Sequence, residues 1–465
     1  MGIDFTSQST RMVAIELYNR MIEKNSKYQN LVLGTGQGKT AIGVATAGLF
    51  AVRFKQDINV FVIAPRSKID EASWNWTIDE YNKIAKYKLN LIEATTPDML
   101  TVAKKNDKLL KREIKAMPPS KQKKLKFLKQ WYKQSVEKPT VFLIDESHNF
   151  KNPTSKRSKA LQQLIKGGIG VGLTATPMTN GMLQDGVAYL IYNGYYNSQQ
   201  DFRNQHIPPM NYNKFHQPDV FLENGDIDPN RFYELERFEF EVSETNYAPQ
   251  VPIDFDMPQS DEYSLSYDLS NETIIKMKQF HKDYRKRRYD SYMKYLSDLR
   301  NAIGSDMNHR RMLARILLSK KPQQPLIFYY TDAEYESIVF TLEKLGMRYS
   351  KLNGHSDSDT MATIDQNDTE QAIVIQYKSG GTGNEFKNSH MSIFYGLQYS
   401  WGETEQAMGR NMRRGMPKDL IVEQIFLVAT NPHDAKVFNA LQNKQKFTEK
   451  FKEAIAEEIM VASLE

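Results

Sequence analysis

The chain has no cysteine among its 465 residues. Disulfide bonds, thiolate zinc sites, iron–sulfur clusters and cysteine nucleophiles are therefore excluded. It also lacks any run of about 18 apolar residues, the length that a membrane-spanning helix needs, and its N-terminus has no signal-peptide core. Short-period repeats and low-complexity segments are absent as well. We therefore expect no membrane partner, and we expect internal symmetry only at the level of domains.

The overall composition is typical of a folded globular protein. Apolar residues make up 40% of the chain and charged residues 25%, which excludes a disordered or collagen-like chain. At roughly 150 residues per domain, the length predicts two to three domains.

The basic residues are unevenly distributed. The chain carries 62 basic and 56 acidic residues, a formal net charge of +6. Lys104–Lys133 holds 12 basic and 2 acidic residues, Lys276–Lys321 holds 14 and 4, and the intervening Asp219–Glu272 holds 2 and 15. Basic blocks indicate a polyanionic partner, although a solvated helix face has the same composition.

The second basic block also contains tyrosines. Tyr284, Tyr289, Tyr292 and Tyr295 alternate with arginine and lysine, a mixture suited to phosphate contact and base stacking. The last three also have helical spacing, which equally fits side chains that face a core.

Short apolar runs that end in glycine, proline or acidic residues recur in two parts of the chain. They are Asn30–Leu33, Val60–Ala64, Val141–Ile144 and Gly170–Leu173, and then Pro325–Tyr330, Gln371–Gln376 and Met391–Tyr395. The alternation of such runs with helical stretches predicts buried parallel sheets. We therefore expect two α/β domains, separated by about 130 residues that lack this pattern.

A glycine-rich loop follows the first apolar run. The segment Gly34-Thr35-Gly36-Gln37-Gly38-Lys39-Thr40 lies between a strand and a helical stretch, the context that a phosphate loop requires. Backbone amides would surround a triphosphate, Lys39 would reach its β and γ oxygens, and Thr40 would ligate magnesium. Leu33 stands where the full pattern has glycine, and a glycine turn without nucleotide is the alternative.

An acidic pair ends the third apolar run, in the sequence Asp145-Glu146-Ser147-His148. A carboxylate at a strand end can hold Mg²⁺, and its neighbour can orient or deprotonate the attacking water. Together with the phosphate loop, Asp145 and Glu146 predict a nucleotide hydrolase.

A pair of arginines in the second part completes this hypothesis. On a helix, Arg410 and Arg413 would share a face and meet the charge that develops on the γ-phosphate. Since they lie far from the phosphate loop in sequence, we expect a site closed between two domains. Hydrolysis would then be coupled to domain movement, as a motor requires.

At these residues the sequence resembles the superfamily 2 helicases and translocases, and within them the Swi/Snf-type branch. Asp145–Asn152 is similar to the branch's Asp-Glu-x-His-x-x-Lys-Asn, a DEAH-like box, and Leu173–Asn180 to its Leu-Thr-Gly-Thr-Pro-x-x-Asn, with Ala175 in place of glycine. Ser379–Asn384, Trp401 and Gln406–Arg413 resemble the last two motifs of the family in order and spacing.

The resemblance implies an α/β fold of two RecA-like parallel-sheet domains in tandem, with a largely helical insertion between them. The domains would be 1–190, with the Lys-rich insertion 104–133, and 321–465, and the insertion would be 191–320, acidic and then basic. ATP and Mg²⁺ would bind at the interdomain cleft, and a nucleic acid would run across both domains.

The resemblance also assigns roles in the ATP site. Asp145 and Thr40 would hold magnesium, and Glu146 would activate water. Arg410 and Arg413 would be arginine fingers, with Gln406 near the γ-phosphate. The residues that would contact ATP are Gly34, Thr35, Gly36, Gln37, Gly38, Lys39, Thr40 and, at the adenine edge, Gln8.

Further roles concern the nucleic acid. Thr174 and Thr176 would link the state of ATP to the nucleic-acid track. The residues expected to approach that track or to touch its phosphates are Arg66, Thr96, Gly381 and Gly383.

The leading hypothesis is an ATP-dependent DNA translocase or helicase in replication, recombination or repair, with duplex DNA favoured over single-stranded or forked DNA. An RNA helicase shares the acidic box, but Lys151-Asn152 and Asn180 count against it. A nucleotide-gated DNA-binding scaffold with little turnover is the third hypothesis, which Glu146 and the two arginines count against.

The compact chain also resembles stand-alone motors of bacteriophages and bacteria. We therefore expect it in the cytoplasm of a bacterial or phage-infected cell, with a recruiting protein for targeting, and as a monomer or an oligomer of unknown size.

Overall fold

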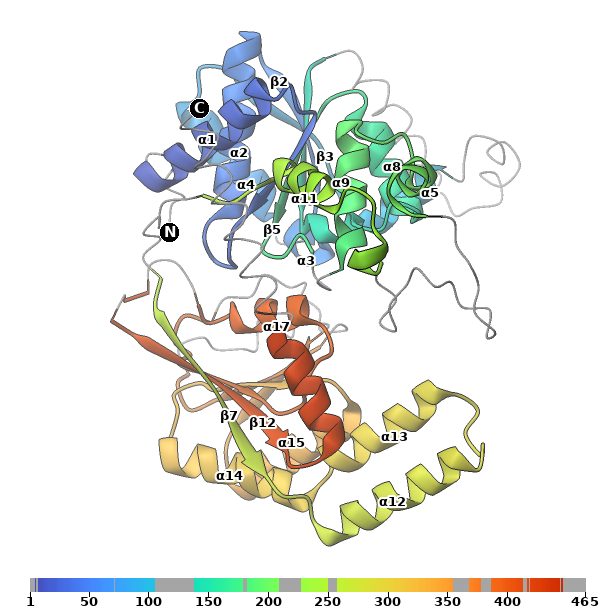
Figure 1. The fold of residues 1–465 in the computed structure, drawn as a ribbon. Helices are drawn as coiled ribbons and strands as arrows, with labels where there is room; N and C mark the ends of the chain where they lie inside the picture. The colour runs from blue at the N-terminus through green and yellow to red at the C-terminus, as the bar shows by residue number, and fades with distance from the viewer. Residues whose placement is uncertain are drawn as a thin grey trace, which may run out of the picture. The chain divides into compact units, whose positions relative to one another are not determined.

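The computed structural model describes residues 5, 7–70, 72–104, 138–178, 182–208, 227–249, 257–353, 368–377, 386–412, 416–417, 419–443 and 445. The chain divides between residues 254 and 255 into two compact units, shown in Figure 1. The predicted insertion 191–320 falls on both sides of this division, so its described residues up to 249 belong to the first unit and those from 257 to the second. Apart from Lys104, the basic block Lys104–Lys133 lies outside the described residues.

The first unit is built on a six-stranded parallel sheet in the order β3-β2-β4-β5-β1-β6. Its strands are β1 (Tyr28–Val32), β2 (Ile58–Ile63), β3 (Leu89–Thr95), β4 (Thr140–Asp145), β5 (Ile169–Thr174) and β6 (Asn246–Tyr247). Strands β1, β2, β4 and β5 coincide to within two residues with the apolar runs that predicted them. Their side chains are buried on both faces, as a parallel sheet requires.

Helices cover both faces of this sheet. Helices α1, α2 and α4 lie on one side and α5, α8 and α9 on the other (Figure 1). The helices of the unit are α1 (Gln8–Glu23), α2 (Lys39–Phe54), α3 (Arg66–Asp70), α4 (Ser73–Ile84), α5 (Pro97–Lys104), α8 (Lys156–Ile165), α9 (Val187–Asn193), α10 (Gln199–His206) and α11 (Leu235–Glu244). Short 3₁₀ helices lie at Ser147–Phe150, Leu183–Gly186 and Pro229–Arg231.

The second unit has its own six-stranded parallel sheet, in the order β7-β12-β11-β8-β10-β9. Its strands are β7 (Gln259–Tyr267), β8 (Leu326–Tyr329), β9 (Tyr349–Leu352), β10 (Ala372–Gln376), β11 (Met391–Phe394) and β12 (Ile421–Ala429). Its helices are α12 (Asn271–Arg285), α13 (Tyr292–Gly304), α14 (Met307–Lys320), α15 (Asp332–Lys344) and α17 (Trp401–Met408), and a further helix covers residues 432–443. Both units are RecA-like α/β domains, which confirms the predicted fold class.

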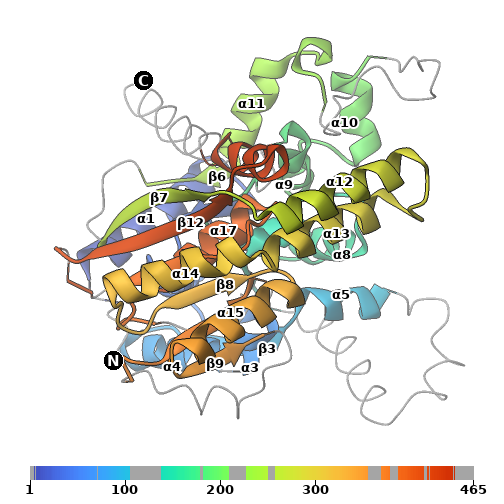
Figure 2. The ribbon, with the colours of Figure 1, turned by 90° about the horizontal axis from the view of Figure 1, so that it is seen from below.

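Helices α12 and α13 form a hairpin that extends away from the second sheet. Figures 1 and 2 show the two helices side by side. Between them the rings of Tyr284 and Tyr295 stack with their centroids 4.4 Å apart, and Tyr289 meets Tyr295 edge to face at 5.5 Å. These tyrosines therefore pack against one another. Tyr295 also packs against the core of the second unit, whereas Tyr284 and Tyr292 are exposed. Among the described helices, none combines the length and the apolarity that crossing a bilayer demands.

Candidate active site

The glycine-rich loop joins the end of β1 to the start of α2. Gly36 and Gly38 both have φ of +82°, and Gly38 is the N-cap of α2. Residues other than glycine rarely adopt this backbone conformation, so the two glycines determine the turn of the loop. The loop amides and the positive end of the α2 dipole therefore lie together, an arrangement that favours a phosphate group.

The side chains of the loop hold it in shape. Lys39 Nζ donates to the carbonyl oxygens of Leu33 at 3.0 Å and Gly34 at 3.1 Å, and Gly34 N donates to Gln37 Oε1 at 2.6 Å. Leu33 itself does not have a positive φ, and its N–H donates to Thr174 O at 3.1 Å. The backbone at this position therefore does not need the glycine that the full pattern has.

The carboxyl ends of the parallel strands bring the predicted residues to one edge of the sheet. Asp145 is the last residue of β4 and pairs with Leu173 of β5, while Val32 of β1 pairs with Thr174. Arg66 and Thr96 follow β2 and β3 at the same edge. The phosphate loop, the acidic pair and the strand-end residues are thus gathered by strand order, at the position where α/β sheets bind ligands.

Asp145 is a buried carboxylate between cations. Burial, and then the charge of Glu146, raise the pKa of Asp145 above its usual range, whereas the ammonium groups of Lys39 and Lys68 lower it. Glu146 N donates to Asp145 Oδ1 at 3.1 Å. A further cation at this position would favour the ionised carboxylate.

The residues present suit a magnesium ion held mainly by its nucleotide. No group of three or more acidic or histidine ligands occurs among the described residues. Magnesium is commonly bound by one or two carboxylates together with phosphate oxygens and water. Asp145, with the hydroxyl of Thr40 at the start of α2, provides the protein's part of such a set.

Glu146 and His148 connect the acidic pair to β5. Glu146 has φ of +51°, a left-handed conformation that a residue with a side chain adopts only at a cost. His148 Nδ1 lies 3.3 Å from Glu146 Oε2 and 3.1 Å from Thr174 Oγ1, and Thr176 N donates to the same hydroxyl at 3.1 Å. A continuous chain of polar contacts therefore runs from Glu146 through His148 to Thr174 and Thr176, and the last two are buried.

A polar cluster beneath the acidic pair fixes the spacing of β1 and β5. Asn30 Oδ1 accepts hydrogen bonds from Tyr28 Oη at 2.6 Å and Ser147 Oγ at 2.8 Å. Gly172 of β5 lies against this cluster, where a Cβ would come within 2.0 Å of Asn30 Oδ1 and 2.3 Å of Tyr28 Oη. The close approach requires glycine.

Gln8 and Gln406 are also predicted to lie near the nucleotide. Gln8 is exposed at the start of α1, which packs against α2 through Tyr18 and Phe50, with ring centroids 5.1 Å apart. In the second unit Gln406 lies on α17. The residues that fall outside the described part of the chain are Arg413, Gly381 and Gly383.

The helix expected to carry Arg410 and Arg413 on one face ends earlier than the spacing predicts. Helix α17 stops at Met408, with Gly409 as its C-cap. Arg410 lies in the following turn, where its carbonyl accepts a hydrogen bond from Phe386 N at 3.0 Å in place of continuing the helix. The i and i+3 helical geometry therefore does not apply to Arg410, whose side chain is buried.

The sequence patterns assign no role to two residues near the acidic pair, His148 and Lys68. His148 belongs to the DEAH-like box, but its contact with Thr174 depends on the pairing of β4 with β5. Lys68 follows β2 and acts electrostatically on Asp145. No local pattern marks Lys68, because its position depends on β2 lying beside β4 in the sheet.

Two family models match separate parts of the chain, one in each of its two compact units. Residues 5–179 match the model of the type III restriction enzyme res subunit, and residues 308–415 match that of the helicase conserved C-terminal domain. No curated protein matches the sequence. Among solved structures, the SWI2/SNF2 ATPase core of Sulfolobus solfataricus in complex with double-stranded DNA is similar over 95% of this chain and 93% of that one, at 16% identity and a TM-score of 0.36.

Proposed function

We propose that the chain is a superfamily 2 DNA translocase of the Swi/Snf-type branch. Its two domain matches indicate an ATP-hydrolysing enzyme of the helicase type. It would couple ATP hydrolysis to movement along duplex DNA, in replication, recombination or repair. The observation that carries this proposal is the chain of contacts from Glu146 through His148 to Thr174 and Thr176. It links the carboxylate that activates water to the segment after β5, so that a change at the nucleotide can alter a strand-end loop.

The residues of the first unit have distinct tasks in this proposal. Lys39 and the loop amides bind the triphosphate, Thr40 and Asp145 hold Mg²⁺, and Glu146 orients the attacking water and accepts its proton. Bound Mg²⁺ would neutralise charge on the transferred phosphoryl group. The place of Asp145 at the end of β4, on the sheet edge that also carries the glycine-rich loop, supports its assignment as the magnesium ligand.

The second unit and the strand ends supply the other proposed roles. Arg410 and Arg413 act as arginine fingers, with Gln406 near the γ-phosphate, and Gln8 reads the adenine edge. Arg66 and Thr96, which follow β2 and β3, touch the phosphates of DNA, and Gly381 and Gly383 approach the DNA track.

The extension of the DEAH-like box supports the Swi/Snf-type assignment over an RNA helicase. Lys151 of this extension forms a 2.7 Å ion pair with Asp185, which lies beyond the Leu173–Asn180 motif. Asp185 and Lys151 are both largely buried. The DEAH-like box is thus tied to the segment that follows the second motif by a residue that belongs to the branch's own pattern.

ATP turnover tests the proposal directly. Wild type and Lys39→Ala are assayed without nucleic acid and with single-stranded, duplex and forked DNA and with RNA, at two salt concentrations. Lys166→Ala, which removes an exposed lysine at the end of α8, is the matched control. We expect strong stimulation by duplex DNA, lost in Lys39→Ala and kept in Lys166→Ala.

Other outcomes would replace the proposal. Stronger stimulation by RNA would identify an RNA helicase. Binding of ATP and DNA without turnover in any condition would identify a nucleotide-gated scaffold.

A further inference from the structure

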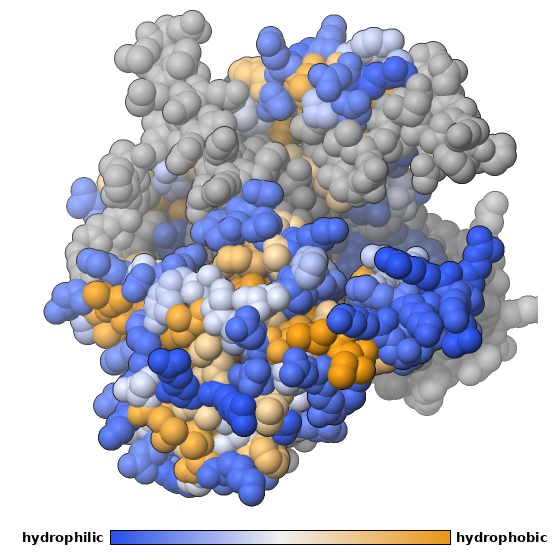
Figure 3. Space-filling view, turned by 60° about the horizontal axis from the view of Figure 1, so that its bottom comes forward, coloured by the Kyte–Doolittle hydropathy of each residue, from blue (hydrophilic) through white to orange (hydrophobic). Residues whose placement is uncertain are grey.

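One side of α12 carries a row of basic residues. Lys278, His281, Lys282 and Arg285 lie on α12, and Lys286 is its C-cap. Each lies three or four residues from another member of the set, so they share one face. We call these five residues the basic face of α12. They line a shallow groove of about 400 Å³, to which no acidic residue of the described chain contributes. Figure 3 shows hydrophilic side chains gathered over the hairpin at the right of the view.

The cations of this face differ from three other exposed cations of the hairpin. Away from it, Lys276, Arg288 and Lys294 are each paired with an acidic residue: Glu272 at 2.6 Å, Asp283 at 2.9 Å and Asp298 at 2.7 Å. Within the described part of the chain, the two exposed lysines at 278 and 282 form no such ion pair, and neither do Arg285 and Lys286. Their charge is therefore not balanced by an ion pair within the described residues, and Asp283, which lies near Lys282, forms its ion pair with Arg288.

The opposite side of α12 is packed, so the basic face is held outward. Met277 is buried and Phe280 packs against the same core cluster of the second unit. Tyr284 stacks on Tyr295 of α13, whose hydroxyl lies 3.1 Å from His281 Nδ1. Because both helices are fixed by these contacts, α12 presents the basic face to solvent without rotating.

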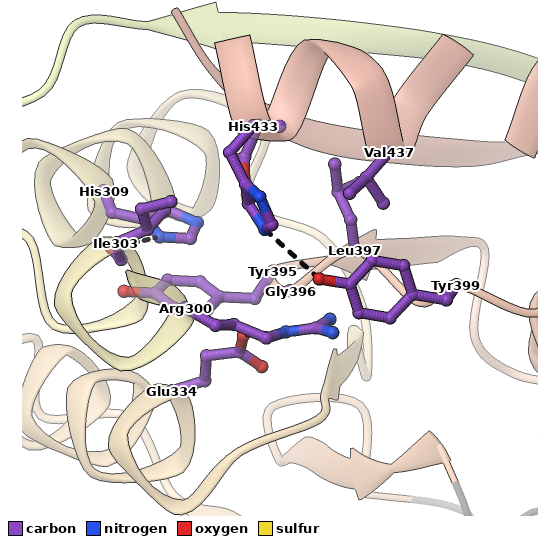
Figure 4. A pocket seen from close by; sticks show the side chains of 11 residues that line it. Arg300, Ile303, His309, Glu334, Tyr395, Gly396, Leu397, Tyr399, His433 and Val437 are labelled. Atoms are coloured by element: carbon purple, nitrogen blue, oxygen red, sulfur yellow. Dashed lines mark hydrogen bonds and ion pairs between the residues drawn. The ribbon is translucent and has the colours of Figure 1, made fainter. Parts of the chain in front are cut away.

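The base of the hairpin is anchored by a buried arginine (Figure 4). Arg300 of α13 lies 3.4 Å from Glu334 Oε1, and its guanidinium covers the rings of Tyr330 at 4.1 Å and Tyr399 at 5.0 Å. Tyr399 precedes α17 by two residues. The hairpin is therefore attached, within the second unit, to the segment that leads into the helix carrying Gln406.

We propose that the basic face of α12 binds the sugar-phosphate backbone of duplex DNA, as a contact outside the motor motifs. This inference rests on the proposed function, because it names a second contact for the same substrate. At 1.5 Å per residue the face extends about 12 Å, and duplex DNA carries one negative charge per about 1.7 Å of axis. Several phosphates therefore lie within reach of its four permanent cations.

The arrangement of the hairpin's tyrosines favours duplex over single-stranded DNA as the ligand of the basic face. Proteins that bind single strands combine basic residues with aromatic rings on which bases stack. Here Tyr284 and Tyr295 stack on one another. The residues that line the groove of the basic face include no tyrosine, and the exposed Tyr284 and Tyr292 lie off it. The face itself therefore offers phosphate contacts, which suits a duplex whose bases are already paired.

Two triple variants test the inference. The first is Lys278→Ala/Lys282→Ala/Arg285→Ala, on the basic face; the control is Lys276→Ala/Arg288→Ala/Lys294→Ala, which removes the same charge from the same hairpin. Binding to a short duplex is measured by fluorescence anisotropy between about 50 and 200 mM salt. Circular dichroism melts establish that both are folded, and the single charge reversal Lys282→Glu provides a second variant of the basic face.

We expect the first variant to bind duplex DNA at least about tenfold more weakly at low salt. The slope of log affinity against log salt should be smaller by about 0.9 for each phosphate that is no longer neutralised, so by about 2.7 for three. The control should bind more tightly than the first variant, because its three cations are paired with carboxylates of the protein and do not line the groove.

The failures of the two proposals are distinguishable. If wild type binds duplex DNA and the basic-face variant matches the control, the inference is overturned and the proposed function stands. If wild type neither binds DNA nor responds to it, both are overturned. If the basic-face variant loses affinity for single-stranded DNA or RNA but not for duplex, the assignment of duplex DNA is overturned.

Discussion

His148 Nδ1 lies 3.1 Å from Thr174 Oγ1, which joins the acidic box after β4 to the last residue of β5. The same nitrogen lies 3.3 Å from Glu146 Oε2. One imidazole therefore contacts both the carboxylate proposed to activate water and the strand that leads to Thr176.

Replacing Thr174 tests whether this contact couples the nucleotide to DNA. Thr174→Val removes the hydroxyl that His148 and Thr176 N share, while nearly keeping the volume of the side chain. Since residues that connect two sites typically change coupling by about 0.5–2 kcal/mol, we expect the ratio of DNA-stimulated to basal turnover to fall about 2- to 30-fold.

The matched control for this change is Thr341→Val in α15, whose hydroxyl donates to Ser337 O at 2.8 Å and is also buried. The ratio should be unchanged in the control. An equal ratio in Thr174→Val and wild type would show that the contact is structural only.

Glu146→Gln should separate binding from chemistry. The amide has nearly the same shape but cannot accept a proton from water, so we expect kcat for ATP to fall about 10²- to 10⁴-fold. Binding of a fluorescent ATP analogue should stay within about threefold of wild type, because Lys39 and the loop are untouched. Glu336→Gln, an exposed position in α15, serves as control, and normal turnover in Glu146→Gln would remove Glu146 from the proposed mechanism.

Much of the fold was accessible from the sequence because its signals are local. The strands β1, β2, β4 and β5 are continuous apolar runs with clear ends, and the phosphate loop follows directly from β1. Lys39 could therefore be placed at the start of a helix, and Asp145 at the end of a strand, before any pairing was known.

Other features depend on which strands pair, or lie on strands that are short or mostly exposed, and these have no local signal in the sequence. Strand β6 is only two residues long, and β7 has mostly exposed side chains along its edge of the second sheet. Lys68 reaches Asp145 only because β2 lies beside β4. The early end of α17, set by a carbonyl contact of Arg410 with Phe386, is likewise a tertiary effect.

Gly172 should tolerate no side chain. In Gly172→Ala the new Cβ would overlap Asn30 Oδ1 and Tyr28 Oη, which already form a hydrogen bond of 2.6 Å. Overpacking of this kind typically costs about 1–3 kcal/mol in the free energy of unfolding, measurable by urea titration. Gly167→Ala is the control, since its Cβ would meet only Leu164 O at 3.6 Å, and equal stability of the two variants would contradict the predicted close packing.

His309 should make the second unit sensitive to acid. The ring lies between Tyr395, with centroids 3.6 Å apart, and Tyr267 at 4.5 Å. Burial lowers the pKa of His309 to about 3, whereas an unfolded histidine titrates near about 6.5. Between these values the unfolded chain binds a proton that the folded one does not, so the free energy of unfolding should fall as the pH drops from about 6.5 towards 3.

The variant His309→Phe keeps a ring in this stack but cannot titrate. Its midpoint of thermal unfolding should fall less steeply with acidification than that of wild type. Carboxylates common to both proteins cancel in the comparison. Parallel pH profiles would show that His309 does not contribute.

The strand order of the first sheet also determines when the phosphate loop can take shape during synthesis. Strand β1 is made first, yet among the described strands its partners are β5 and β6, so that Tyr28 lies opposite Gly170 and Asn30 opposite Asn246. At 5–20 residues per second, the ribosome takes on the order of ten seconds to make the chain between β1 and β5. During that interval the loop has no folded sheet to support it. The nascent chain should therefore acquire nucleotide affinity only after β5 has emerged, late in the folding of a domain whose first strand carries the loop.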